Sequence, residues 1–464
     1  MQKNKAGITT PIVDFVKKYA DSEMIRFHMP GHKGKSFLGC EAFDITEISG
    51  ADSLYEAEGI IAESERNATE LFGSGKTLFS TEGSSQCIRA MLSLCLMAGR
   101  EKSPGTRQKI AAARNVHKAF IYAATLLDFD VVWLWPQNGR ESICSCDVSK
   151  EQVEAVLEQD QDIAAVYVTS PDYLGGQLDL QGIAEICHER KVLLAVDNAH
   201  GAYLKFLELS RHPLDLGADI CCDSAHKTLP VLTGGAYLHI GKNAPRVIFE
   251  QAKYAMNLFG STSPSYLIMA SLDLANRYLA EGYGEKLKHT IVMRNACCEQ
   301  LRNNGWKILE SDPLKITLEI PKDVTKQELT DKLREQGVEC EYADRKFVVF
   351  MLTPENTEED FGRLRKILSE YVPVYEQVQG EAEGFVISTT QVMSIREAMF
   401  SLPETVSVSE AEGRICRVPT VSCPPAIPIA VPGERITQEL ITLFEHYGIT
   451  TLDVVANHFF ARSS

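Results

Sequence analysis

Short apolar runs alternate with amphipathic stretches between about residues 75 and 240. The apolar runs are residues 78–79, 110–113, 131–134, 164–168, 192–196, 218–222 and 235–240. The segments between them, such as residues 183–190, carry apolar side chains at helical spacing. Strands that alternate with helices predict an α/β fold with a mostly parallel, doubly wound sheet.

The pattern changes after this region. Residues 314–320 alternate like a half-buried strand that could pair with residues 347–351, and the charged, glycine-bearing residues 376–384 are typical of a linker. We therefore expect a large domain at 49–285, a small α+β domain at 286–375 and a C-terminal segment or domain at 376–464.

Composition narrows the class of partner. The chain has 464 residues, 44% of them hydrophobic, which is ample for more than one core, and a net charge of −16. Nucleic acid and anionic membranes need a positive surface, so neither is expected as a partner, whereas a cationic substrate suits this charge. No apolar run approaches the roughly 18 residues of a membrane span and no leader is evident, so we expect a cytoplasmic protein.

The 13 cysteines include the adjacent pairs Cys221-Cys222 and Cys297-Cys298 but no C-x-x-C motif. This spacing predicts neither a metal site nor a disulfide framework. We expect most of these cysteines to be reduced, buried thiols.

A lysine and a carboxylate stand at the ends of two predicted strands. Asp197 ends the run 192–196, and Lys227 follows the run 218–222 in the string Ser224-Ala225-His226-Lys227. Pyridoxal phosphate needs both groups, because a lysine amine holds its aldehyde as a Schiff base and an acid keeps its ring nitrogen protonated. Taken singly, such a string is also typical of a solvated loop, and a strand-end aspartate of a helix cap.

Two further strand ends fit the same cofactor. Gly83, Ser84 and Ser85 open a helical pattern after residues 78–79, where backbone N–H groups and hydroxyls favour a phosphate, although a simple serine N-cap gives the same pattern. His117 follows residues 110–113 and could stack on a pyridine ring or lie on the surface. Ligands collect at the carboxyl ends of strands in open α/β sheets, so this order along the chain favours one site.

A series of strings resembles the Orn/Lys/Arg decarboxylase family of pyridoxal-phosphate enzymes, which has the aspartate-aminotransferase type of fold. The strings are Phe27-His28-Met29-Pro30-Gly31-His32-Lys33-Gly34, Asp44-Ile45-Thr46-Glu47, Asp197-Asn198-Ala199-His200-Gly201, Ser224-Ala225-His226-Lys227, Thr262-Ser263-Pro264-Ser265-Tyr266, Pro424-Pro425-Ala426-Ile427-Pro428 and Pro432-Gly433-Glu434. They span nearly the whole chain. The chain resembles the short form of the family, without the extra N-terminal domain of its larger members, and the resemblance implies an N-terminal arm at residues 1–48.

The resemblance implies a role for each matching residue. Lys227 would hold the cofactor, Asp197 would pair with its ring nitrogen and His117 would stack on the ring. The residues expected around the phosphate are Gly83, Ser84, Ser85, Ser224 and His226, with Ser261 or Thr262 reaching the phosphate of a neighbouring subunit. The active unit would then be a homodimer or a higher homo-oligomer.

The resemblance also implies the reaction: decarboxylation of a basic amino acid, arginine to agmatine first, then lysine or ornithine, in polyamine biosynthesis. Lys227 and His200 are both candidates for the acid that protonates Cα. The alternatives are another pyridoxal-phosphate reaction such as transamination, with Arg396 or Arg414 binding the substrate carboxylate, and a catalytically silent binding subunit. The acids that could meet a basic side chain, each also typical of a surface carboxylate, are Asp52, Glu56, Glu341 and Glu434.

Two residues depart from the family pattern, and one string resembles an unrelated motif. Glu82 stands where the family usually has asparagine, and its charge should repel a phosphate unless the side chain turns away; Asn198 stands where relatives often have an acid. Residues 73–77 resemble the end of a P-loop, but the first glycine of that motif would fall on Glu70. We therefore expect Gly73 to be a helix stop.

Overall fold

The computed structural model describes residues 7–136, 142–375, 389–422 and 426–456. The linker expected at 376–384, and Pro424 and Pro425 of the proline-rich string, lie outside these residues. The chain forms two compact units, each assembled from segments distant in sequence. The first contains Met1–Gln108, Val153–Ser170 and Asp179–Lys288, and the second contains Lys109–Gln152, Pro171–Leu178 and His289–Ser464.

The first unit is built on strands in the order β1-β7-β6-β5-β4. Their bounds are β1 Lys76–Ser80, β4 Ile163–Thr169, β5 Leu193–Asp197, β6 Ile220–Asp223 and β7 Ala236–Ile240. Strands β4, β5 and β6 run parallel, as the sequence predicts, whereas β7 runs antiparallel to β6 and β1. The link from β6 to β7 contains one short helix, α7 (Ala225–Thr228).

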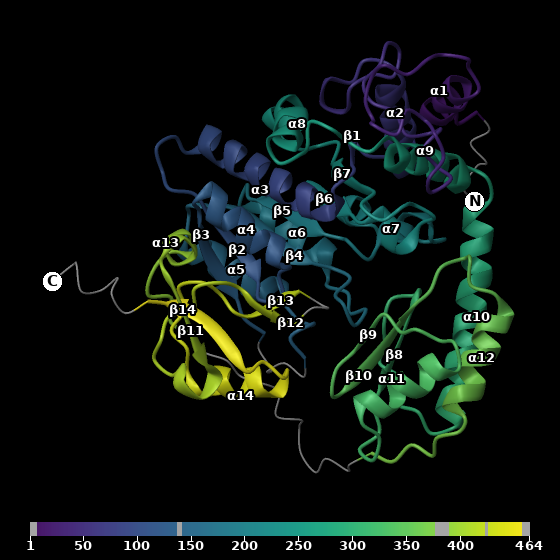
Figure 1. Ribbon diagram of the computed structural model, residues 1–464. Helices are drawn as coiled ribbons and strands as arrows, with labels where there is room; N and C mark the ends of the chain where they lie inside the picture. The colour runs from purple at the N-terminus through teal and green to yellow at the C-terminus, as the bar shows by residue number, and fades with distance from the viewer. Residues whose placement is uncertain (1–6, 137–141, 376–388, 423–425, 457–464) are drawn as a thin grey trace. The chain divides into compact units, whose positions relative to one another are not determined.

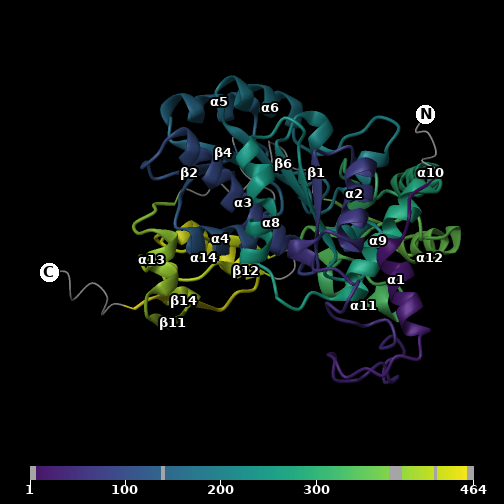
Figure 2. The same cartoon turned by 90° about the horizontal axis from the view of Figure 1, so that it is seen from above.

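Helices cover both faces of these strands. Helix α3 (Gly83–Lys102) crosses one face beside α8 (Arg246–Leu258), and α6 (Leu180–Glu189) packs against β5 on the other, so this part is doubly wound (Figures 1 and 2). Helix α3 buries Met91, Leu92 and Cys95 along its length. The remaining elements of the unit are α1 Pro11–Ala20, η1 Leu54–Glu56, α2 Ile60–Phe72, η2 Ala202–Phe206, η3 Pro213–Leu216 and α9 Tyr266–Ala280. Helices α5 (Lys150–Gln159) and α10 (Tyr283–Asn303) have residues in both units.

The second unit combines a parallel pair, β2 (Lys109–Ala113) and β3 (Asp130–Leu134), with an antiparallel sheet in the order β8-β10-β9. The expected pairing of residues 314–320 with 347–351 is confirmed by β8 and β10. The other bounds are α4 Lys118–Leu127, β8 Lys315–Glu319, α11 Lys326–Glu335, β9 Tyr342–Ala343, β10 Phe347–Met351, α12 Glu358–Leu368, α13 Ile395–Phe400, β11 Pro403–Ser407, η4 Val408–Glu410, β12 Thr420–Ser422, β13 Ile427–Ala430, α14 Gln438–His446 and β14 Thr451–Val455. One apolar core, which includes Phe347, Ile429 and Phe444, joins the sheet to the C-terminal segment.

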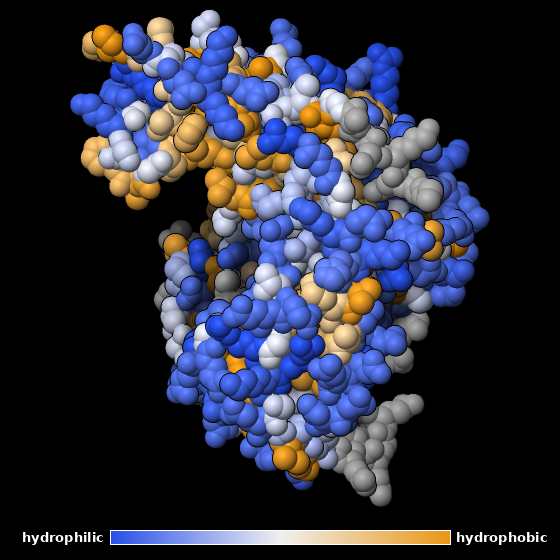
Figure 3. All heavy atoms as spheres, turned by 90° about the vertical axis from the view of Figure 1, so that its right-hand side faces the viewer, coloured by the Kyte–Doolittle hydropathy of each residue, from blue (hydrophilic) through white to orange (hydrophobic). Residues whose placement is uncertain are grey.

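The described residues before α2 belong to the first unit. Helix α1 packs on α2 and α9, and the chain from residue 21 to 53 has little regular structure. This stretch exposes large apolar side chains, namely Met24, Ile25, Phe27, Met29, Phe37 and Leu38. Hydrophobic surface also gathers at the top left of Figure 3. The domain boundaries expected from the sequence stay a prediction.

Three observations bear on the remaining sequence predictions. Gly73 ends α2 with φ +63°, and Lys76 and Thr77 lie in strand β1, so the P-loop-like string is a helix stop, as expected. The 12 described cysteines are free, and ten of them are buried. Among the described residues no helix is both long and apolar enough to cross a membrane.

A buried ion pair ties β2 to the C-terminal segment within the second unit. Arg114 follows β2 and is fully buried, and its Nη2 lies 2.9 Å from Oε2 of Glu434. The rings of Trp133 and Trp135 flank the guanidinium, with centroids 5.0 and 5.2 Å away. Thr389 donates to the other oxygen of Glu434, so the carboxylate is held on both sides.

Removing one charge of this pair should destabilise the second unit. Arg114→Met leaves Glu434 buried without its cation, and we expect the free energy of unfolding to fall by about 3–5 kcal/mol. All three tryptophans of the chain lie in this unit, so tryptophan fluorescence during urea unfolding measures the change. Arg334→Met, which removes an exposed pair with Glu339, is the control and should change the free energy of unfolding far less. Equal losses in the two variants would contradict the role assigned to the buried pair.

Candidate active site

Two parallel strands of the first unit end in the residues that the sequence singles out. Strand β5 ends at Asp197 and continues into the turn that carries His200, while β6 is followed by Ser224 and the short helix α7 that contains Lys227. The structure brings Lys227 and His200 together, with Nζ 2.9 Å from Nε2. An amine and an imidazole at this distance can pass a proton between them.

Asp197 is buried and surrounded by donors. Tyr167 donates its hydroxyl to Oδ2 at 3.1 Å, and the backbone N–H of Ala199 and the thiol of Cys222 donate to Oδ1 at 3.2 and 3.7 Å. Burial raises the pKa of Asp197 above its ordinary value, while the charge of Lys227 and these donors act in the opposite direction. A buried carboxylate with donors on both oxygens is a suitable partner for a protonated pyridine nitrogen.

The beginning of α3 lies beside the segment that carries Ser224. Ser224 donates to Oγ of Ser84 at 2.8 Å, and the N–H of Gly83 donates to the carbonyl of Gly234 at 2.7 Å. Gly83 has φ +69°, and a Cβ added there would meet no heavy atom within 4 Å, so space is open at this point. The helix start carries no side-chain cap, so the N–H groups that follow Gly83 can face an anion.

Glu82 does not point into this space. Its carboxylate accepts a hydrogen bond from the backbone N–H of Ser261, on the segment after α8. The repulsion expected from an acid in the phosphate loop is therefore avoided. Ser261 and Thr262 themselves are exposed.

His226 and His117 have defined ring contacts. Nδ1 of His226 lies 2.9 Å from the carbonyl of Gly235, and since a carbonyl only accepts, Nδ1 carries the proton. Burial lowers the pKa of His226, so its Nε2 would donate to a phosphate only after the ring gains a second proton. His117 lies in the second unit and accepts the N–H of Ala119 on Nδ1 as the N-cap of α4; its stacking on a ring stays a prediction.

The residues of the first unit fit pyridoxal phosphate. They supply an amine at Lys227, a buried carboxylate at Asp197, and hydroxyls with free helix N–H groups where a phosphate would bind. Thr169, which pairs with Asp197 in the β4–β5 register, also has a buried hydroxyl with no hydrogen-bond partner among the described residues. Orphaned polar atoms of this kind mark places where a ligand supplies the missing partner.

Several candidate side chains already have protein partners. Glu434 is buried against Arg114, so its interpretation as a surface carboxylate is wrong. Asp52 accepts backbone N–H groups at the start of α2, and Glu341 accepts the hydroxyl of Tyr173. The arginines considered for a substrate carboxylate are also engaged: Arg414 pairs with Glu404, and Arg396 donates to the carbonyl of Thr125.

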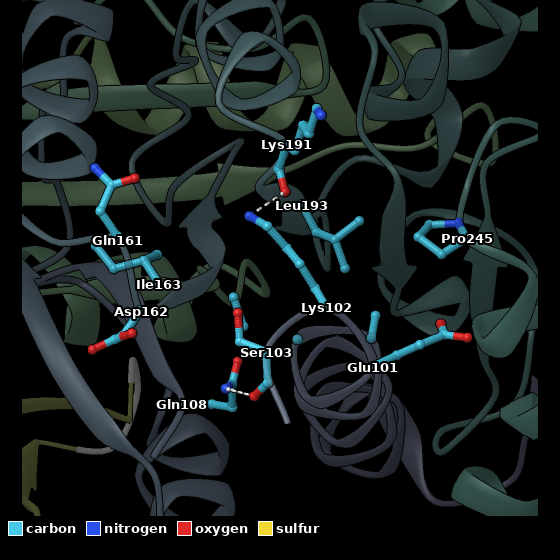
Figure 4. A pocket seen from close by; sticks show the side chains of 13 residues that line it. Glu101, Lys102, Ser103, Gln108, Gln161, Asp162, Ile163, Lys191, Leu193 and Pro245 are labelled. Atoms are coloured by element: carbon cyan, nitrogen blue, oxygen red, sulfur yellow. Dashed lines mark hydrogen bonds between the residues drawn. The ribbon is translucent and has the colours of Figure 1, made fainter. Parts of the chain in front are cut away.

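A pocket of about 240 Å³ lies elsewhere, at the opposite edge of the sheet. It is lined by the last turn of α3, including Lys102, and by Ile163 and Leu193 at the beginnings of β4 and β5 (Figure 4). Lys102 donates to the carbonyl of Lys191 there at 3.3 Å. Catalytic groups of this fold class gather at the carboxyl ends of the strands, so this pocket is not the candidate site.

Sequence reasoning missed the residues that support Asp197 and the strand ends. Tyr167 lies two residues before the end of β4, and strand alternation could have placed its side chain on the same face as Thr169. The buried cluster of His212, Asp223 and His239 joins residues that no local pattern connects. Only the folded chain shows these contacts.

Known proteins resemble this chain over most of its length. Residues 10–321 match the family model described as Orn/Lys/Arg decarboxylase, major domain, and residues 373–453 match the C-terminal domain of the same family. Arginine decarboxylase of Bacillus subtilis is 29% identical over 93% of this chain and 92% of its own length, and that of Halalkalibacterium halodurans is 30% identical over 92% and 91%. The crystal structure of a lysine decarboxylase from Francisella novicida superimposes with a TM-score of 0.80 at 19% identity, over 97% of this chain and 82% of that one, which shows a shared fold.

Replacing Lys227 tests the site. Lys227→Ala removes the amine that would hold the cofactor, so we expect purified protein mixed with pyridoxal phosphate to lose the visible absorption band of the lysine-bound cofactor. Catalysis should fall by about three orders of magnitude or more. Lys242→Ala, at an exposed lysine of the same unit, is the control and should keep both. A band that persists in Lys227→Ala would mean that another lysine holds the cofactor.

Proposed function

Because the chain belongs to the Orn/Lys/Arg decarboxylase family and is a pyridoxal-phosphate-dependent decarboxylase, we propose that it converts arginine to agmatine and carbon dioxide. The observation that carries the chemistry is the contact of 2.9 Å between Lys227 and His200, beside the buried carboxylate of Asp197. The choice of arginine rests on the relatives named arginine decarboxylase, which match more than nine-tenths of the chain. We assign the reaction to polyamine biosynthesis in the cytoplasm.

The bound cofactor would supply an electron sink for the bond between Cα and the carboxylate. Lys227 would hold the cofactor through its amine, and Asp197 would keep a proton on the ring nitrogen. Tyr167 and Cys222 keep the Asp197 carboxylate in one orientation. Ser84, Ser224 and the N–H groups of α3 that follow Gly83 would bind the phosphate and so fix the position of the ring.

The carboxylate group leaves as carbon dioxide. The electron pair of the broken bond stays behind, and Cα must gain one proton. Lys227 and His200 are within proton-transfer distance of each other, so either can deliver that proton while the other replaces it. His200 is buried, which keeps bulk water from the exchange. The net change is one amino acid and one proton converted to one amine and carbon dioxide.

Competition among basic amino acids tests the substrate. Arginine, lysine and ornithine are supplied at equal concentration, and agmatine, cadaverine, putrescine and carbon dioxide are quantified. We expect agmatine to exceed either other amine by about tenfold or more, since a site built to bond a guanidinium rejects groups that leave its partners unpaired. Lys227→Ala is the blank. A keto acid without carbon dioxide would indicate transamination. An excess of cadaverine would mean that lysine is the substrate, and an excess of putrescine would mean that it is ornithine.

We also propose that the active unit is a homodimer in which Ser261 or Thr262 completes the phosphate site of the partner copy. Both residues are exposed, and Glu82 holds the backbone of Ser261 beside the start of α3. The apolar side chains exposed by the arm, among them Phe27 and Leu38, favour a surface that another copy covers.

Mixing two inactive variants tests this sharing of residues. Lys227→Ala and a Ser261→Ala/Thr262→Ala variant are unfolded together and refolded as a mixture. If the hydroxyls act across the interface, hybrid dimers regain one intact site, and activity at limiting cofactor should rise toward about a quarter of the parent value. Each variant refolded alone is the control. No gain in a mixture that sedimentation shows to be dimeric would place these hydroxyls outside the partner's site, and an active monomer would contradict the dimer.

A further inference from the structure

Asp223 lies at the end of β6 as a fully buried carboxylate with a partner on each oxygen. His212 and His239 place their Nε2 atoms 3.1 Å from Oδ2, and Asn198 donates its Nδ2 to Oδ1 at 2.7 Å. A carboxylate only accepts, so each Nε2 carries a proton and the amide nitrogen of Asn198 faces the acid. Three donors therefore satisfy one buried anion.

The surroundings keep this anion in place. Burial by itself would raise the pKa of Asp223, but His212 and His239 hold it below its ordinary value, so the carboxylate stays ionised. The hydroxyl of Thr77 lies 2.8 Å from Nδ1 of His239, and the ring of Phe72 packs against both histidines. Hydrogen bonds to charge are strongest in such an apolar setting.

Asn198 connects this cluster to the catalytic turn. It follows Asp197 directly, its N–H donates to the carbonyl of Cys222, and its own carbonyl accepts the N–H of Gly201. A Cβ on Gly201 would lie 2.0 Å from Oδ1 of Asn198, so the turn closes tightly over the amide. The turn from Asp197 to Gly201 is thus fixed at both its backbone and its side chain.

We propose that Asn198 and Asp223 are a matched pair of positioning residues that sets the contact between His200 and Lys227. The pair joins the turn bearing Asp197 and His200 to the strand end that leads through Ser224 to Lys227. It also accounts for the departure at position 198: an acid there would face the Asp223 carboxylate at hydrogen-bond distance, and two anions cannot share that place. This inference rests on the proposed decarboxylase site.

Exchanging the two side chains is the decisive test. Asn198→Asp places two carboxylates at hydrogen-bond distance from each other. Asp223→Asn replaces the carboxylate that accepts from Asn198 and both histidines by a second amide. The double variant Asn198→Asp/Asp223→Asn restores every bond, because the new amide oxygen accepts from both histidines and its nitrogen donates to the new acid. Asp219→Asn is the matched control, since Asp219 is a buried acid that accepts from His188 and from the N–H of Leu194 at the other end of the same strand.

The readouts separate positioning from folding. For each variant we would measure the melting temperature, cofactor retention, the wavelength of the cofactor band, and kcat and KM for arginine. We expect Asn198→Asp to shift the band and to lower kcat by about tenfold to a hundredfold with a smaller change in KM, and the double variant to recover to within about threefold of the parent. Asp219→Asn should lower the melting temperature but leave kcat and the band close to parent values.

Three results would overturn the inference. One is a folded Asn198→Asp variant with the band and kcat of the parent, and another is a double variant no better than the worse single variant. The third is zinc bound at one ion per chain in the parent protein and lost in His212→Gln. His212, Asp223 and His239 have ligand atoms within 4.8 Å of one another, and such a result would make them a metal site. A parent protein that forms no lysine-bound cofactor band would instead refute the proposed function.

Discussion

The parallel register of β5 and β6 decides the geometry of the candidate site. Asp197 pairs with Cys222 in this ladder, so the last residue of β5 lies beside the last residues of β6. The turn after Asp197 and the helix after Asp223 therefore leave the same edge of the sheet, and His200 meets Lys227 there. A shift of one residue would turn Asp197 to the opposite face and separate these groups.

Three buried carboxylates are accommodated in three different ways. Glu434 is neutralised by Arg114, Asp223 is surrounded by two imidazoles and an amide, and Asp197 has weaker donors together with the charge of Lys227. The pKa of Asp223 lies below its ordinary value and that of Asp197 above it, although β5 and β6 are neighbours. The acid proposed to pair with the cofactor is thus the one with the weaker donors, and the acid with three donors belongs to the proposed positioning pair.

Two departures from the family pattern have physical explanations in the folded chain. Glu82 turns from the phosphate loop to bind the N–H of Ser261, and Asn198 donates to Asp223. Each unusual side chain has a partner that is distant in sequence. In both cases that partner lies on another element of the chain.

The sequence by itself determined the strands, the helix stop at Gly73, the short-range strings around Asp197 and Lys227, and the cofactor class, because apolar periodicity and strand-end chemistry are local. It predicted parallel β4, β5 and β6 but not the antiparallel β7, since strand direction depends on where the chain returns. Tyr167 on Asp197, the Arg114–Glu434 pair and the Asp223 cluster were decided only by tertiary structure. Their partners lie tens to hundreds of residues apart, and what selects them is the cost of burying a charge without a partner, which exists only once the chain is packed.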